Sequence, residues 1–70
     1  MEPTDAVFAV LAEADEPLHW TVIQDRALRA GYLDPFTTPG VRDAVLAAIR
    51  ALVADGRIAK TAKGVYETAR

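Results

Sequence analysis

Apolar residues recur every three or four positions in three stretches of the chain, which predicts amphipathic helices over about 4–15, 21–30 and 38–55. The period changes near the C-terminus, where two short β-compatible runs flank Ala62-Lys63-Gly64 and predict a two-stranded hairpin over about 57–68. Between the first two helices, Leu18-His19-Trp20 could form a minimal strand. The pattern therefore predicts a mainly α protein with a small β-hairpin, in a single domain over residues 1–70.

Polar residues at the ends of these stretches predict where each helix starts and stops. Threonine hydroxyls are favoured N-caps, and we expect one at the start of each helix: Thr4, Thr21 and Thr38. Gln24 would complete a capping box for the second helix, and Pro39 suits the first position of the third. Glycine adopts a left-handed backbone easily, so we expect Gly31 and Gly56 to end the second and third helices and Gly64 to turn the hairpin.

The hydrophobic core must be built by a small set of large side chains, because alanine makes up 14 of the 70 residues and fills little volume. We expect the core to contain Val7, Phe8, Val10, Leu11, Leu18, Trp20, Ile23, Leu28, Leu33, Val45, Ile49, Leu52, Ile58 and Tyr66. The connection between the second and third helices carries Tyr32, Leu33 and Phe36, which we expect to anchor it to the rest of the domain.

Composition excludes several classes of function. The chain lacks cysteine, so it has no disulfide and no cysteine-ligated metal site, and it also lacks serine and a glycine-rich phosphate loop. We therefore expect no enzymatic activity and no cofactor, and we expect the single histidine, His19, to order the turn before Thr21 rather than to bind a metal. No apolar run approaches the roughly 20 residues of a membrane span and no signal peptide is visible, so we expect a cytoplasmic protein that does not bind membranes.

The charge is unevenly divided along the sequence, although the whole chain has a formal net charge of only −2. Residues 1–35 carry two arginines against seven carboxylates, a net charge of −5. Residues 36–70 carry six cations against three carboxylates, a net charge of +3. A phosphate backbone would be attracted to the second half of the chain and repelled by the first.

Three short motifs, in this order of elements, resemble the winged helix-turn-helix domains known as HARE-HTH domains. They are Pro17-Leu18-His19-Trp20-Thr21-Val22-Ile23 before the second helix, Thr37-Thr38-Pro39 at the start of the third, and Lys60 with Gly64-Val65-Tyr66 in the hairpin. The resemblance covers roughly residues 4–68 and implies a winged helix-turn-helix fold. It departs from the family at Ile58, where members often have a large aromatic residue, and at Thr68, where they have a larger apolar one, so we expect a more loosely packed wing.

Domains of this family occur in restriction and other DNA-modifying proteins, in chromatin regulators and in the delta subunit of bacterial RNA polymerase. The resemblance therefore implies a module that binds double-stranded DNA, in transcription regulation or DNA modification, rather than a catalyst. The delta-type members can be acidic and dock on protein, which implies an alternative: Glu13, Asp15 and Glu16 would bind a basic partner in the transcription machinery. A third interpretation is a dimeric adaptor or antitoxin-like regulator, and the sequence leaves open whether the protein is a monomer or a homodimer.

Helix-turn-helix geometry places the N-terminal part of the third helix in the major groove. Arg42 could then bind guanine or a phosphate, and Thr37 and Thr38 could donate to phosphate with help from the helix N-terminus. The hairpin would lie along the DNA backbone and contribute Arg57, Lys60 and Lys63, with Arg70 extending the same patch. Arg50, on the polar side of the third helix, is a weaker candidate. The alternatives are that the threonines only cap the helix, that Arg42 is solvated or pairs with Asp34 or Asp43, and that the lysines only protect the hairpin from edge-to-edge pairing.

Overall fold

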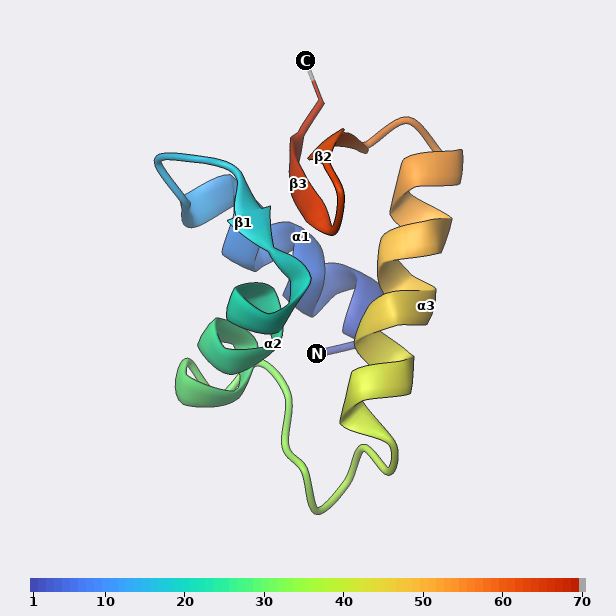
Figure 1. The fold of residues 1–70 in the computed structure, drawn as a ribbon. Helices are drawn as coiled ribbons and strands as arrows, with labels where there is room; N and C mark the ends of the chain where they lie inside the picture. Colours follow the sequence, from blue (N-terminus) through green and yellow to red (C-terminus); the bar gives the residue numbers. More distant parts are fainter. Residues whose placement is uncertain (70) are drawn as a thin grey trace.

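Three helices and a three-stranded antiparallel sheet form the fold in the computed structural model, which describes residues 1–69 (Figure 1). The elements follow the chain in the order α1 (Pro3–Glu13), β1 (Leu18–His19), α2 (Trp20–Arg29), α3 (Val41–Ala54), β2 (Ile58–Ala62) and β3 (Val65–Thr68). The predicted helices, minimal strand and hairpin are therefore all present, and the predicted mainly α class with a small sheet is confirmed at this level.

The sheet has the strand order β1-β3-β2, so the hairpin strand β3 is its centre. Leu18 of β1 lies opposite Tyr66, and the β2–β3 ladder runs from the Ile58–Thr68 pair to the Ala62–Val65 pair with an irregularity after Lys60. Lys63 and Gly64 form the turn, and Gly64 has a φ of +73°. The hairpin and its glycine turn are confirmed.

The start of α1 differs from the prediction. The helix begins at Pro3 with Glu2 as its N-cap residue, so Thr4 lies inside the helix and does not cap it. Proline is favoured at the first helical position, because its fixed φ suits the helix and its missing N–H would have no partner there. The helix ends at Glu13, slightly before the predicted end, because Ala14 takes an extended conformation that leads toward β1.

The predicted capping box at the start of α2 is wrong. The helix begins at Trp20, and its N-cap is His19, whose Nδ1 accepts a hydrogen bond from the amide of Thr21 over 3.3 Å. The same nitrogen lies 2.8 Å from the Thr21 hydroxyl oxygen. Because β1 ends at His19 and α2 begins at the next residue, Thr21 is already helical, and the buried carboxamide oxygen of Gln24 accepts no hydrogen bond within residues 1–69.

The predicted start of α3 is also wrong, because the helix begins at Val41 rather than near Thr38. Asp34 closes a turn of its own before the helix: its carbonyl oxygen accepts from the amides of Thr37 (3.1 Å) and Thr38 (2.8 Å). Gly40 then takes a left-handed conformation, with φ of 65°, which separates Pro39 from the helical residues. The predicted C-terminal stops are confirmed, because Gly31 and Gly56 have positive φ just after α2 and α3.

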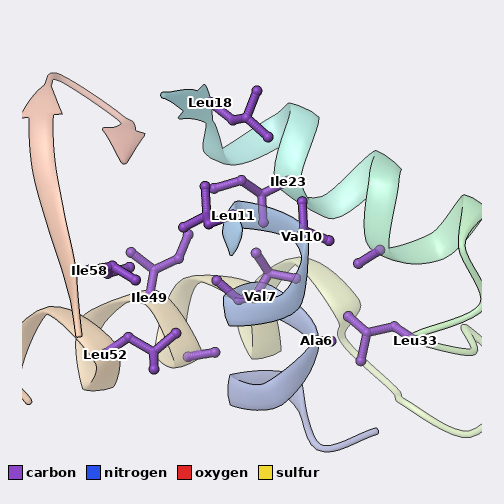
Figure 2. Close-up of a cluster of buried hydrophobic side chains, with 13 residues drawn as sticks. Ala6, Val7, Val10, Leu11, Leu18, Ile23, Leu33, Ile49, Leu52 and Ile58 are labelled. Atoms are coloured by element: carbon purple, nitrogen blue, oxygen red, sulfur yellow. The ribbon is translucent and has the colours of Figure 1, made fainter. Parts of the chain in front are cut away.

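The core lies where α1, α2 and α3 meet beneath the sheet, and Figure 2 shows side chains from all three helices converging there. Its buried members are Ala6, Val7, Val10, Leu11, Leu18, Ile23, Ala27, Leu33, Val45, Ala48, Ile49, Leu52 and Ile58. Four predicted core residues pack against this cluster while half-buried: Phe8, Trp20, Leu28 and Tyr66. Phe36 is a failed prediction, because its side chain is 96% exposed and anchors nothing.

Candidate nucleic-acid interface

A groove of about 260 Å³ runs between α3 and the β2–β3 hairpin, which lie side by side in Figure 1. It is lined by Ile49, Arg50, Val53, Ala54, Lys60 and Tyr66. The two cations come from opposite walls, because Arg50 belongs to α3 and Lys60 to β2. The groove therefore combines an apolar lining with a positive charge on each side.

A chain of contacts connects the first turn of α3 to the tip of the same hairpin. The Arg42 guanidinium carbon lies 5.6 Å from the centre of the Trp20 ring. The amide of Trp20 donates to the carbonyl oxygen of Gly64 over 2.9 Å, and Lys63 directly precedes that glycine. Arg42 and the hairpin tip thus both contact Trp20, one through its ring and the other through its backbone.

Four exposed cations belong to α3 and the hairpin, and we call them the basic set: Arg42, Arg50, Lys60 and Lys63. Within residues 1–69, the ion pair present joins Arg29 to Asp25 on α2, and no member of the basic set forms one. Their charges are therefore not cancelled by a bound carboxylate. Asp43 and Asp55, at the two ends of α3, add negative charge to the same helix.

Carboxylates gather in a different groove, of about 450 Å³, which is lined by Leu11, Ala14, Asp15, Glu16, Pro17, Ala59, Glu67, Thr68 and Ala69. Ala59 and Glu67 are paired across the hairpin, and each directly neighbours a residue of the basic groove, Lys60 and Tyr66. Successive side chains of a strand point to opposite faces of the sheet. The sheet therefore separates a basic groove beside α3 from an acidic groove beside the end of α1.

The predicted site residues do not all lie together. Arg42, Lys60 and Lys63 belong to the basic set, whereas the Arg57 guanidinium carbon lies 4.4 Å from the centre of the Phe8 ring of α1, at the base of the hairpin. Thr37 and Thr38 lie in the turn closed by Asp34, outside α3. Neither threonine caps the helix, although Thr38 was predicted to do so. Arg70 lies outside the described residues.

Trp20 is the residue that the predicted site missed, and Arg50 was expected only as a weaker candidate. The sequence contained a signal for Arg50, because it falls with Arg42 on the polar side of the helix, opposite the apolar stripe. Trp20 was expected to be a core residue, and it does pack against the core while half-buried. Its contact with Arg42 depends on how α2 and α3 pack, which no local pattern shows.

Within the described part of the chain, no three histidine, aspartate or glutamate side chains are grouped so that they could hold a metal ion. The helices of residues 1–69 are too short or too polar to cross a membrane. Comparisons of the chain with protein-family models, curated proteins and solved structures gave no match.

Proposed function

We propose that this chain is a winged helix-turn-helix module that binds double-stranded DNA, with α3 as the recognition helix and the β2–β3 hairpin as the wing. The order of helices and strands and the HARE-HTH-like motifs support this assignment. The observation that carries it is the segregation of charge: the basic set lies on α3 and the hairpin, while Asp15, Glu16 and Glu67 line a groove on the other side of the sheet.

The basic set suits a phosphate backbone for two reasons. Its members form no ion pair within residues 1–69, so phosphates would not have to displace a bound carboxylate. The positions of Arg50 and Lys60 on opposite walls of one groove would let a single strand of DNA meet both. In this proposal Arg42, in the first turn of α3, reaches a base edge or a phosphate, and the hydroxyls of Thr37 and Thr38 remain candidates for phosphate contacts.

The test compares two double charge reversals that change net charge equally. Arg50→Glu with Lys60→Glu places two negative charges in the proposed groove, whereas Arg26→Glu with Arg29→Glu places two on α2, beside the groove between α1 and α2. Fluorescence anisotropy with a labelled duplex at about 50 mM salt measures the affinity. We expect a loss of more than about tenfold for the first pair and a much smaller loss for the second. Equal losses, or no binding by the wild type, would refute the proposal.

A second function is favoured by one specific observation, the acidic groove. Its carboxylates Asp15, Glu16 and Glu67 surround apolar residues including Leu11 and Ala14, so it could hold a lysine- or arginine-rich segment of a protein partner. The HARE-HTH resemblance suggests the transcription machinery as the source of that partner.

The matching test uses a triple variant that neutralises the acidic groove, Asp15→Asn with Glu16→Gln and Glu67→Gln. An arginine-rich peptide that binds the wild type but not this variant, together with no binding of DNA by the wild type, would favour the second function over the first. Equal binding of the peptide by both proteins would refute a role for the acidic groove.

A further inference from the structure

The contact between Trp20 and Arg42 places an aromatic ring against one of the cations of the proposed interface. We infer that Trp20 is a positioning residue, whose indole holds the Arg42 guanidinium so that its N–H groups face DNA. This inference rests on the proposed DNA-binding function and names a residue through which that function would work. In this inference Arg42 binds one kind of ligand, a pair of acceptor atoms on nucleic acid that lie close enough together for bidentate hydrogen bonding.

Trp20 is well placed to serve as a fixed support. Its amide is bonded to Gly64 in the hairpin tip, 2.9 Å away, and its side chain packs half-buried against the hydrophobic core. The His19 ring lies beside it, with 5.8 Å between the ring centres and a tilt of 34°. The start of α2, the hairpin and the core therefore all restrict the position of the indole.

Arg42 is exposed, and its guanidinium group lies near an aromatic ring rather than bound to a carboxylate. The 5.6 Å between the guanidinium carbon and the centre of the Trp20 ring is within the range of a cation–π interaction. A guanidinium that rests on an aromatic ring can keep the N–H groups at its edge available as donors, whereas a salt bridge would use them. Asp43 is the next residue along the helix, yet it forms no ion pair with Arg42.

The planar donor pair of guanidinium matches two acceptor pairs on DNA, the O6 and N7 atoms of guanine and two oxygens of a phosphate. Both require the plane of the group to be oriented, and a side chain that is already oriented loses less freedom on binding. Trp20 therefore improves binding through Arg42 and not through contacts of its own. Duplexes of only A·T pairs and of only G·C pairs distinguish the two ligands, because a phosphate contact is present in both.

The experiment is a double-mutant cycle on DNA affinity with the full chain. We expect Arg42→Gln to weaken binding about tenfold or more and Trp20→Leu to weaken it about two- to fivefold. The double variant should bind like Arg42→Gln alone, because the indole then has no guanidinium to orient. Trp20→Phe keeps an aromatic face and should restore most of the affinity. Urea unfolding shows whether each variant is folded.

Tryptophan fluorescence supplies a readout that a purely structural role would not change, since Trp20 is the single tryptophan of the chain. We expect DNA to alter the Trp20 emission of the wild type and to alter it much less in Arg42→Gln. Arg42→Lys is the variant that stays informative if Trp20→Leu does not fold: it keeps the charge without the planar donors and should lose nearly as much affinity as Arg42→Gln.

Three results would overturn the inference while leaving DNA binding intact. They are an equal loss from Trp20→Leu with and without Arg42, an affinity of Trp20→Phe as low as that of Trp20→Leu, and full affinity in Arg42→Lys. Failure of the wild type to bind any duplex overturns the proposed function instead, and the inference with it.

Discussion

The amide of Trp20 and the carbonyl oxygen of Gly64 form a 2.9 Å hydrogen bond that fastens the start of α2 to the tip of the hairpin. Gly64 has a φ of +73°, and a Cβ atom at this position would lie 2.9 Å from Nε2 of His19 and 3.4 Å from a ring carbon of Trp20. The tip can therefore approach α2 this closely only because residue 64 has no side chain. This close approach sets the distance between the proposed wing and the rest of the domain.

Substitution of Gly64 should reveal the cost of separating these two elements. Alanine in a left-handed conformation costs roughly 1–2 kcal/mol, and we expect Gly64→Ala to exceed this because the methyl group also meets His19. Gly31 is the matched control, since its φ is +78° and a Cβ there meets nothing within 4 Å. Urea denaturation should show a larger loss of unfolding free energy for Gly64→Ala than for Gly31→Ala. Equal losses would mean that the hairpin tip moves without cost.

His19, rather than Thr21, caps α2, and variants at the two positions should show it. Removing an N-cap side chain costs about 1 kcal/mol, so His19→Ala should lower the free energy of unfolding by about that amount. His19→Asn should retain most of the stability, because asparagine is itself a good N-cap. Thr21→Ala should have the smaller effect in thermal or urea unfolding. A larger loss from Thr21→Ala would support the capping box instead of the observed cap.

The helices and the hairpin could be predicted from sequence because their signals are local. The spacing of apolar residues sets the face of each helix, and Gly31, Gly56 and Gly64 end elements by a backbone preference of their own. The N-caps were mispredicted because the start of a helix depends on the path of the backbone before it. Gly40 takes a left-handed conformation, so α3 begins at Val41, and β1 carries His19 to the point where α2 begins.

The residues of the candidate site could be predicted only in part from the sequence, for a similar reason. The cations at the hairpin and at the start of α3 could be named from the order of elements. Arg57 could not be separated from them, because its position over Phe8 depends on how the hairpin base packs on α1. The acidic groove could not be predicted from the sequence either, because Glu16 and Glu67 are 51 positions apart and line the same groove only in the folded chain.

Phe36 should contribute little to stability despite being one of the two phenylalanines of the chain. Its side chain is 96% exposed, and substitutions at such surface positions usually change the free energy of unfolding by less than about 0.5 kcal/mol. Leu33, from the same connection, is 3% exposed, and Leu33→Ala should cost about 2–5 kcal/mol. Urea denaturation of Phe36→Ser and Leu33→Ala measures both. A large loss from Phe36→Ser would restore its predicted role as an anchor.

Tyr32 should ionise at higher pH than an ordinary tyrosine. Its hydroxyl donates a hydrogen bond to Glu13, and this bond, followed by burial and the charge of Glu13, raises the pKa of Tyr32 above its ordinary value. Because the folded pKa is raised, the stabilisation is fully present below the unfolded pKa and is lost as pH rises through the folded pKa. In a Tyr66→Phe background, the phenolate absorbance should report a lower pKa for Tyr32 in Glu13→Ala. An unchanged pKa would contradict this hydrogen bond.

The slope of DNA affinity against salt concentration should show how many members of the basic set contact phosphates. The logarithm of the binding constant falls with the logarithm of salt concentration by about 0.9 for each neutralised phosphate, so four contacts predict a slope of about −3.6. Lys60→Gln should reduce the steepness by about 0.9, because it removes one phosphate contact. Arg26→Gln removes the same charge from α2, away from the basic groove, and should leave the slope unchanged. Equal changes in the two slopes, measured by anisotropy across a salt series, would show that net charge rather than the groove determines binding.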